Sequence, residues 1–398
     1  MTGETTANHP LRLSKRPAAL SPRSTVRLVD LFAGCGGLSL GAEQAAYANG
    51  VALQTLLAVD FESAATTVYR DNFPTAASVV TSSVEDVFDG PLGSPITRKE
   101  LLLQSSLGDV DALVGGPPCQ GHSNLNNHTR RTDPKNTLYL YMSRAAMVLA
   151  PKVVLIENVP AVLRDRHGDN NVVETAKKEL LNLGYQVADS VLPLKEFGVA
   201  QTRKRHVLLA TRPGLPDPAK ILEGVTASVS ESRDLRWAIG DLVGASPEGW
   251  DKPSTPSAEN VKRMTYLLDA NEYDLPNGLR PKCHQNNHSY KSMYGRLRWN
   301  LPAQTLTSGF GSIGQGRYMH PEAKRALTAH EAARIQGFPD YFDFTSITKR
   351  GELAVMIGNA VPPQLAERVF TALIPYLTAA EGKTGMPSDT ELDLARAR

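Results

Sequence analysis

One cysteine of this chain stands in a setting that could make it a nucleophile. Cys119 follows a short apolar run, residues 111–115, and lies in the string Gly-Gly-Pro-Pro-Cys-Gln-Gly-His-Ser of residues 115–123. The apolar run predicts a buried strand that ends in a loop. The two prolines fix the backbone φ just before the thiol and remove two donors, which stiffens the turn. A stiff turn that presents one thiol can hold a reactive group still, and Cys35 and Cys283 lack this setting.

A second string predicts a site for a nucleotide-like cofactor. Residues 30–38 read Asp-Leu-Phe-Ala-Gly-Cys-Gly-Gly-Leu, so glycines separate an apolar run from a predicted helix, whose N-terminal amides stay open to an anion. Asp60 ends the next predicted strand, a place from which a carboxylate binds ribose hydroxyls. This pattern alone also fits a dinucleotide oxidoreductase. Against that class, the third glycine of the usual dinucleotide spacing is missing, and Pro-Pro-Cys-Gln has no role in hydride transfer.

Two charged residues follow further along the chain. Glu157 ends an apolar run and begins the string Glu-Asn-Val-Pro, and Arg205 is the second arginine of a Gln-Thr-Arg-Lys-Arg string that starts at Gln201. A carboxyl at the end of a buried strand suits general acid catalysis. The alternative is a carboxylate that caps a turn.

Together and in this order, these strings resemble the DNA (cytosine-5) methyltransferase family, of the bacterial type II modification kind. The resemblance covers about residues 26–212 and 293–375 and includes Gly-Asn-Ala-Val at residues 358–361. It implies S-adenosyl-L-methionine as cofactor, with Phe61 stacked on the adenine and the adenine amine bound by Ser83 or by Glu85. The cofactor residues that it implies are Phe32, Gly34, Gly36, Gly37, Leu38, Asp60, Phe61, Ser83, Val84, Pro118, Leu138, Asn359 and Val361.

The resemblance also assigns roles in the reaction. The Cys119 thiolate would add to C6 of cytosine, which makes C5 nucleophilic toward the methyl group. Glu157 would protonate N3, and Arg205 would hydrogen-bond O2 and stabilise developing charge. Because a base inside a duplex is out of reach, the cytosine would be flipped into the pocket.

Charge distribution predicts where double-stranded DNA would bind. Net charge is only +2, but residues 275–321 and 117–132 contain no Asp or Glu and carry several Arg, Lys and His. Basic residues interleaved with Tyr, Trp, Asn and Gln suit phosphate and base contacts, although a solvated basic face is the simpler interpretation. His122 stands where the family most often has Phe. The predicted DNA contacts are Gln120, Ser123, Arg130, Arg203, Arg296 and Arg298, with a structural acid as the alternative partner of Arg203.

Other functions remain as alternatives. An RNA (tRNA) cytosine-5 methyltransferase shares the fold but usually has a Cys-Phe-Thr string, which this chain lacks. A non-catalytic DNA-binding relative would lack Cys119, Glu157 or Arg205. Cys283, His284 and His288 are too few for a convincing zinc site, so no metal is expected. The predicted partners are double-stranded DNA and a cognate restriction endonuclease, for an enzyme acting as a monomer.

The elements that must position these residues alternate between strands and helices. Apolar runs predict strands at 26–31, 53–59, 112–114, 153–156 and 207–210, with helices to 48 and at 63–72, 137–149 and 172–183. This alternation predicts an α/β fold with a parallel, doubly wound sheet, the Rossmann-like class I S-adenosylmethionine-dependent methyltransferase fold that the resemblance implies. Later helices are predicted at 235–242, 258–268, 328–335 (opened by a capping box), 351–357 and 362–377.

Composition sets the domain plan. We expect a disordered arm at 1–24, a catalytic domain at 25–212, a small irregular target-recognition domain at 213–292, a returning catalytic segment at 293–378 and a charged tail at 379–398. No run approaches the roughly 20 apolar residues of a membrane helix. Three scattered cysteines suit a reducing compartment, so we expect a bacterial cytoplasmic protein.

Overall fold

The computed structural model describes residues 9–17, 22–118, 137–167, 170–286 and 292–379. Within these ranges a seven-stranded sheet has the order β3-β2-β1-β4-β5-β9-β8. Its strands are β1 (Thr25–Leu31), β2 (Ala52–Asp60), β3 (Val79–Thr81), β4 (Ala112–Gly115), β5 (Val153–Asn158), β8 (Gln186–Pro193) and β9 (Lys204–Thr211), and β6 (Arg166–His167) pairs with β7 (Asn170–Asn171) in a separate ribbon.

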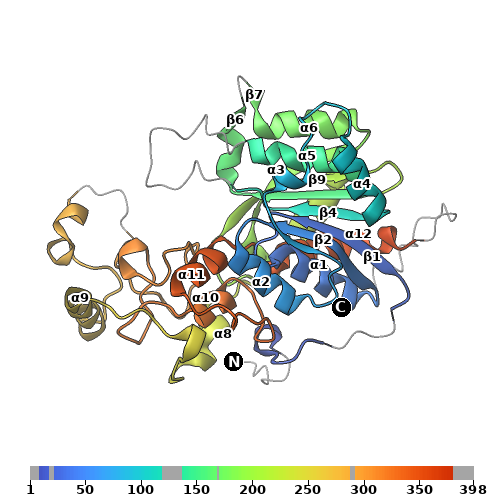
Figure 1. The fold of residues 1–398 in the computed structure, drawn as a ribbon. Helices are drawn as coiled ribbons and strands as arrows, with labels where there is room; N and C mark the ends of the chain where they lie inside the picture. The colour runs from blue at the N-terminus through green and yellow to red at the C-terminus, as the bar shows by residue number, and fades with distance from the viewer. Residues whose placement is uncertain (1–8, 18–21, 119–136, 168–169, 287–291, 380–398) are drawn as a thin grey trace.

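Helices cover both faces of the sheet (Figure 1). The helices are α1 (Gly37–Ala48), α2 (Ser63–Asn72), α3 (Val84–Val87), α4 (Arg98–Leu107), α5 (Leu138–Leu149), α6 (Val172–Asn182), α7 (Pro218–Ala227), α8 (Leu235–Ile239), α9 (Ala258–Asp269), α10 (Ala329–Ile335), α11 (Arg350–Asn359) and α12 (Pro363–Leu377). Short 3-10 helices are η2 (Pro10–Arg12), η5 (Pro160–Arg164), η6 (Leu194–Phe197), η7 (Gly240–Leu242), η8 (Gly249–Asp251), η9 (Asn277–Leu279), η10 (Lys282–His284) and η11 (Ile313–Gln315).

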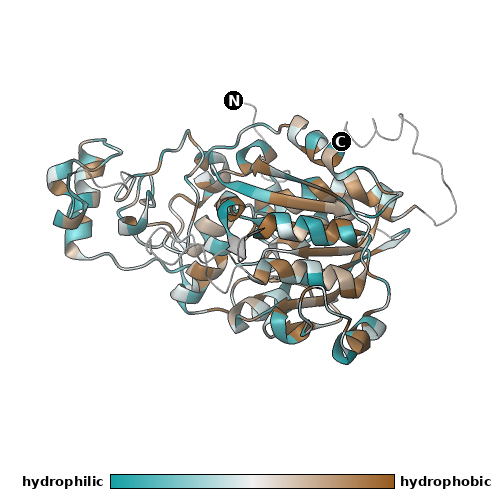
Figure 2. Ribbon diagram, turned by 90° about the horizontal axis from the view of Figure 1, so that it is seen from above, coloured by the Kyte–Doolittle hydropathy of each residue, from teal (hydrophilic) through white to brown (hydrophobic). Residues whose placement is uncertain are grey.

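The alternation of apolar residues explains the layers. One core joins α1, α7 and α12 to one face of the sheet, and a second joins α5 and α6 to the other. In Figure 2 the brown, hydrophobic segments accordingly concentrate in the sheet and in the helices packed on it. The doubly wound α/β class predicted from the sequence is confirmed.

One feature of the predicted sheet is wrong, because it is not parallel throughout. β1, β2, β3, β4 and β5 are parallel neighbours, whereas β9 runs antiparallel to both β5 and β8. β8 was missed altogether. It is an edge strand with mostly half-exposed side chains, so its sequence lacks the continuous apolar run of a buried strand.

The C-terminal helix completes the sheet domain by packing on α1. A Cβ atom added to Gly41 would lie 2.0 Å from the carbonyl oxygen of Pro363, and one on Gly37 would lie 2.1 Å from that of Val361. Only glycine permits this approach of the two backbones. The first and last helices of the described chain therefore meet beside the cofactor string.

The described part of the N-terminal arm is ordered. Residues 9–17 pack on the body of the protein, with Leu11 buried and its carbonyl accepting a hydrogen bond from the Asp340 amide at 2.9 Å. Arg12 pairs with Asp241 at 3.2 Å, and the Arg16 guanidinium lies 5.3 Å from the Phe73 ring centroid. A single buried leucine among polar residues gives no periodic signal, which is why composition alone indicated disorder.

The irregular region contains two kinds of structure. α7 packs on the sheet domain, and α8 packs in a core with α10. A separate small core is built from residues of α9 and of the segments around 294, 313, 319 and 326. Figure 1 shows α9 at the far left, away from the sheet. The boundaries at 213 and 292 stay a prediction, and the predicted tail lies almost entirely outside the described residues.

Candidate active site

A cleft of about 470 Å³ opens at the carboxyl ends of the parallel strands. β2 and β4 flank β1, so the chain reverses its direction of winding there, and ligands of open α/β sheets bind at such a switch point. The predicted site residues that line the cleft are Phe32, Gly34, Gly37, Leu38, Asp60, Phe61, Pro118, Glu157, Arg203, Arg205, Asn359 and Val361.

The turn after β1 is held by the carboxylate at the end of β2. Asp60 accepts a hydrogen bond from the Gly34 amide at 2.8 Å and one from the Glu62 amide at 2.9 Å. Burial raises the pKa of Asp60, and these amide hydrogen bonds oppose the rise. Phe32 adopts a φ of 54°, a strained value for a residue with a side chain, and such strain is often stored at functional sites. Because a carboxylate has about four lone-pair sites, Asp60 keeps acceptor capacity for a hydroxyl group.

A buried polar chain supports this turn from below. The Ser39 hydroxyl, in the first turn of α1, donates to Asp30 at 2.6 Å and lies 2.7 Å from the Tyr69 hydroxyl. Asp30 is fully buried, and desolvation raises its pKa to about 7. Burial also raises the pKa of the Cys35 thiol to about 12, so this cysteine is not a thiolate at neutral pH.

Glu157 and Arg205 form a buried ion pair at the cleft. Only 5% of Glu157 and 7% of Arg205 is exposed. They meet because β9 is antiparallel to β5, which brings the beginning of β9 beside the end of β5. A carboxyl and a guanidinium side by side can contact two neighbouring atoms of one ligand edge.

Asn158 is a site residue to which the sequence analysis gave no role. Its side-chain amide donates to the Pro117 carbonyl at 3.0 Å, and its side-chain oxygen accepts from the Val159 amide at 2.8 Å. Asn158 thereby ties the end of β5 to the proline segment that leads to Cys119. The only available signal was its place directly after Glu157.

Arg203 does not face solvent, in contrast to its predicted DNA contact. It is 2% exposed and donates to the Leu306 carbonyl at 2.8 Å and to the Gly358 carbonyl at 3.4 Å. Burial lowers the pKa of this guanidinium well below its usual value. Since these hydrogen-bond partners are backbone carbonyls, Arg203 connects the start of β9 to the end of α11, next to Asn359.

Two other predicted DNA contacts, Arg296 and Arg298, differ in burial. Arg296 is buried and donates to the Pro321 carbonyl at 2.6 Å and to the Leu267 carbonyl at 3.2 Å, so it serves the small core. Arg298 is exposed, with its guanidinium 4.2 Å from the Tyr273 ring centroid. Burial separates these two arginines, which the sequence could not distinguish.

Several predicted residues are not brought to the cleft lining. Gly36 caps α1, and the Ser83 hydroxyl caps α3 by accepting from the Glu85 amide at 3.2 Å. Val84 is buried, and Leu138 begins α5. Cys119, Gln120, Ser123 and Arg130 lie outside the described residues, as does His122. The choice between Ser83 and Glu85 for the adenine amine stays open.

The described residues contain neither a metal cluster nor a membrane-spanning helix. In the described ranges, no three His, Cys, Asp or Glu side chains gather as a metal site would require, and His288 lies outside those ranges. Among the helices that the structure describes, none combines the length and apolar composition of a membrane span.

Comparison with known proteins decides the family. A family described as C-5 cytosine-specific DNA methylase matches residues 26–375. The chain belongs to this family. This methylase is 41% identical over 358 residues to Type II methyltransferase M1.BsuMI of Bacillus subtilis (strain 168), covering 89% of this chain and 82% of the relative. It is 30% identical to Type II methyltransferase M.DdeI of Desulfomicrobium norvegicum, covering 88% and 89%.

Solved structures show the same fold. A putative DNA modification methyltransferase encoded within an E. coli prophage superimposes on this methylase with a TM-score of 0.62 at 22% identity, covering 88% of this chain and 99% of the other. The S. pombe Dnmt2 methyltransferase gives 0.60 at 16% identity, covering 89% and 99%. The family and the class I fold predicted from the motifs are confirmed, and the chain is a DNA (cytosine-5)-methyltransferase by family.

Proposed function

We propose that this methylase transfers a methyl group from S-adenosylmethionine to C5 of cytosine within a specific short sequence of double-stranded DNA. The cytosine is flipped out of the duplex and forms a covalent adduct between its C6 and Cys119. The observation that carries this proposal is the buried Glu157–Arg205 pair beside the cleft. N3 and O2 are neighbours on one edge of cytosine, so a carboxyl and a guanidinium in contact suit that edge.

The proposed reaction begins with addition to the ring. The Cys119 thiolate forms the S–C6 bond, and the displaced electron pair is taken up as the protonated form of the Glu157 carboxyl gives its proton to N3. Arg205 donates to O2 and stabilises the charge that develops there. After C5 has gained the methyl group, C5 loses its proton to solvent. The electron pair of that C–H bond forms the C5=C6 double bond, the S–C6 bond breaks with its electrons on the departing Cys119 thiolate, and N3 returns its proton to Glu157.

The cysteine needs a fixed approach to the base. Asn158 anchors the Pro117 carbonyl and so supports the segment that enters the Cys119 turn. Cys119 itself lies outside the described residues. Because Asn158 follows Glu157 directly, the acid and the cysteine segment are held by the same strand end.

The residues around the switch point fit the cofactor. Asp60 has acceptor capacity for ribose hydroxyls, Phe61 is 57% exposed at the cleft and can stack on adenine, and Asn359 and Val361 approach from the chain's last segment. Gly34, at which an added Cβ would meet none of the described atoms within 4 Å, leaves room for the methionine portion. S-adenosylmethionine supplies an electrophilic methyl group on its sulfonium centre.

The biological setting is proposed from the relatives. M1.BsuMI and M.DdeI are named type II methyltransferases, so a cognate restriction endonuclease is the proposed functional partner. We propose a monomer in the bacterial cytoplasm that binds the nucleoid while it acts. The two other candidate functions, an RNA methyltransferase and a non-catalytic relative, are outcomes of the test.

The test is transfer of labelled methyl groups from S-adenosylmethionine to unmethylated genomic DNA and, in parallel, to tRNA. Bisulfite sequencing of the DNA product gives the position and the recognition sequence. Cys119→Ser should abolish transfer, whereas the matched variant Cys283→Ser, at an exposed cysteine, should retain it. Methylation of tRNA alone would replace the proposal by the RNA activity, and the absence of transfer to either would favour a binding-only relative.

A further inference from the structure

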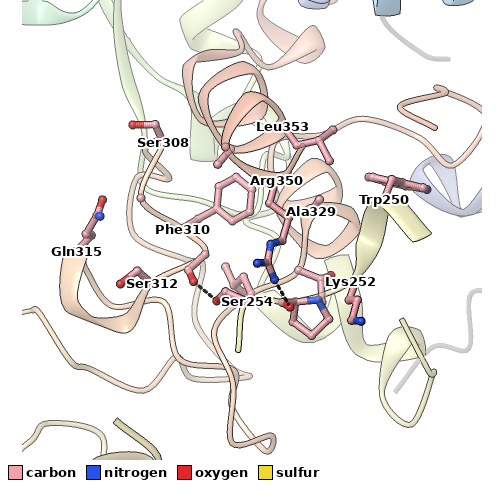
Figure 3. A pocket seen from close by; sticks show the side chains of 17 residues that line it. Trp250, Lys252, Ser254, Ser308, Phe310, Ser312, Gln315, Ala329, Arg350 and Leu353 are labelled. Atoms are coloured by element: carbon pink, nitrogen blue, oxygen red, sulfur yellow. Dashed lines mark hydrogen bonds between the residues drawn. The ribbon is translucent and has the colours of Figure 1, made fainter. Parts of the chain in front are cut away.

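A second cavity of about 220 Å³ lies on the side of α11 away from the reaction cleft. It is lined by four segments: the glycine-rich stretch 308–315, residues 327–329, the first turns of α11 and residues 250–254. Its floor is apolar, formed by Phe310, Leu327, Ala329, Leu353 and Ala354. Figure 3 shows Phe310, Ala329, Arg350 and Leu353 around one space, with Lys252 and Ser254 at its edge.

The rim of this cavity is positively charged. Lys252 and Arg350 line it, and the described residues of its lining include no Asp or Glu. One Arg350 nitrogen donates to the Pro253 carbonyl at 2.9 Å, which leaves the guanidinium with further donors. The nearby acids face other partners, since Asp251 accepts from the His330 amide at 2.7 Å and Glu352 pairs with Lys349 at 2.8 Å.

Hydroxyl groups add neutral donors to the rim. Ser308 and Ser312 line the cavity. Ser254 also lines it but uses its hydroxyl proton to fasten the 250–254 segment to the Gly311 carbonyl at 2.5 Å, and the Thr328 hydroxyl caps α10. Two cations, two hydroxyls and an apolar floor match a sugar–phosphate unit, whose sugar has an apolar face and whose phosphate accepts hydrogen bonds. The volume is below the roughly 300–1,000 Å³ of pockets that hold a whole ligand, so one unit of a polymer fits better.

Its place relative to the cleft suggests which polymer. Gly351 lines both cavities, and Asn359, at the other end of α11, lines the reaction cleft. At 1.5 Å per residue, α11 spans roughly 13 Å between Arg350 and Asn359. Because Gly351 and Glu352 also line the reaction cleft, the two cavities are no farther apart than this length, which is about four base-pair steps of duplex DNA at 3.4 Å each. A duplex whose target base occupies the cleft would therefore pass close to the second cavity.

We propose that this cavity binds one sugar–phosphate unit of the DNA backbone within about four base pairs of the target cytosine. Lys252 and Arg350 hold the phosphate, and the sugar lies over Phe310. This inference rests on the proposed DNA substrate and adds to it a contact that sequence reasoning missed. Lys252 and Arg350 belong to distant segments, neither of which is in the acid-free stretches.

The test compares DNA affinity at several salt concentrations for the wild type, Lys252→Ala, Arg350→Ala and the double variant. Lys349→Ala is the matched control, because Lys349 is an exposed cation beside Arg350 that does not line the cavity. In the double variant, the slope of log affinity against log salt should fall by about 1, equally for specific and non-specific duplexes. The control should keep the wild-type slope.

Neutral methylphosphonate linkages placed one at a time near the target locate the contact. A methylphosphonate at one position should weaken binding by the wild type several-fold and leave binding by the double variant unaffected. The neutral linkage and the two substitutions remove the same contact, so their effects should not add. If the wild type binds DNA but the double variant has the same salt slope, or if no methylphosphonate position has this effect, the inference is overturned and the proposed function is left intact. A wild type that binds no DNA would refute both. Competition by inorganic phosphate at Lys252 and Arg350 without any change in the DNA slope would show a small-anion site and also overturn the inference.

Discussion

Replacing Glu100 by glutamine is expected to destabilise the fold by about 3 kcal/mol at neutral pH, because it leaves a buried guanidinium without its counter-charge. Glu100 and Arg144 are 0% and 1% exposed. The Arg144 Nε donates to Glu100 at 2.9 Å, and the amides of Thr97 and Gly90 donate to the same carboxylate at 2.8 and 3.1 Å. Arg144 also donates to the carbonyls of the loop before α4, so the pair holds that loop to α5.

A cost of about 3 kcal/mol for Glu100→Gln follows in two independent ways. Burial alone would raise the pKa of Glu100, but the Arg144 guanidinium and the backbone amides outweigh it and lower the pKa from 4.5 to about 2. At 1.36 kcal/mol per pKa unit, lowering the pKa from 4.5 to about 2 corresponds to about 3 kcal/mol. Removal of one partner from a buried ion pair costs about 3–5 kcal/mol in proteins generally.

The pH dependence follows from the direction of the shift. Because the pKa is lower in the folded protein, the ionised carboxylate stabilises the fold above about pH 4.5, and this contribution is lost as the pH falls toward 2. Urea unfolding of the wild type and Glu100→Gln between pH 7 and pH 3 should therefore give free energies of unfolding that converge at low pH.

An exposed pair serves as the matched control. Glu259 and Lys262 lie 3.2 Å apart on the surface of α9, and Glu259→Gln should change the free energy of unfolding by less than about 0.5 kcal/mol. The reasoning fails if Glu100→Gln costs less than about 1 kcal/mol at pH 7. It fails equally if the difference from wild type is the same at every pH.

Three further predictions concern the cleft. Phe61→Ala should weaken S-adenosylmethionine binding by about 1–3 kcal/mol in calorimetry, since stacking on a base is worth that much. The melting temperature should not change, because Phe61 is 57% exposed. Equal affinity of variant and wild type would contradict the stacking role. Gly358→Ala should lower the free energy of unfolding by about 1–3 kcal/mol, because the new Cβ would lie 2.4 Å from the Ser308 amide nitrogen. Gly351→Ala in the same helix is the control and should not destabilise the fold, since its Cβ would meet none of the described atoms within 4 Å. Similar unfolding curves for the two variants would contradict this steric argument. Asp30→Asn should remove a pH dependence of stability. Because the pKa of Asp30 is raised to about 7 in the folded protein, the stability of the wild type should fall as the pH rises from about 4 to 7. Melting curves of the variant should lack that fall.

Regular elements with strong periodicity were predictable almost to the residue. The helix predicted at 63–72 is α2, those predicted at 137–149 and 362–377 are α5 and α12 to within one residue, and the capping box of Thr328 and Glu331 opens α10. These elements carry local signals, since an apolar stripe and a cap are both encoded within a few neighbouring residues. The direction of β9 carries no such signal, because an apolar run reports burial and not orientation.

The sequence by itself determined the chemistry of the strings: a thiol behind two prolines, glycines before a helix, a carboxylate at a strand end, and with them the family. The tertiary structure alone decided which of these groups meet. Glu157 contacts Arg205 because β9 returns antiparallel to β5, and Arg203 is buried while Arg298 is exposed although both are the same residue type. Residue type and local spacing are written in neighbouring positions, whereas burial and the pairing of distant charges depend on how the whole sheet and its helices pack.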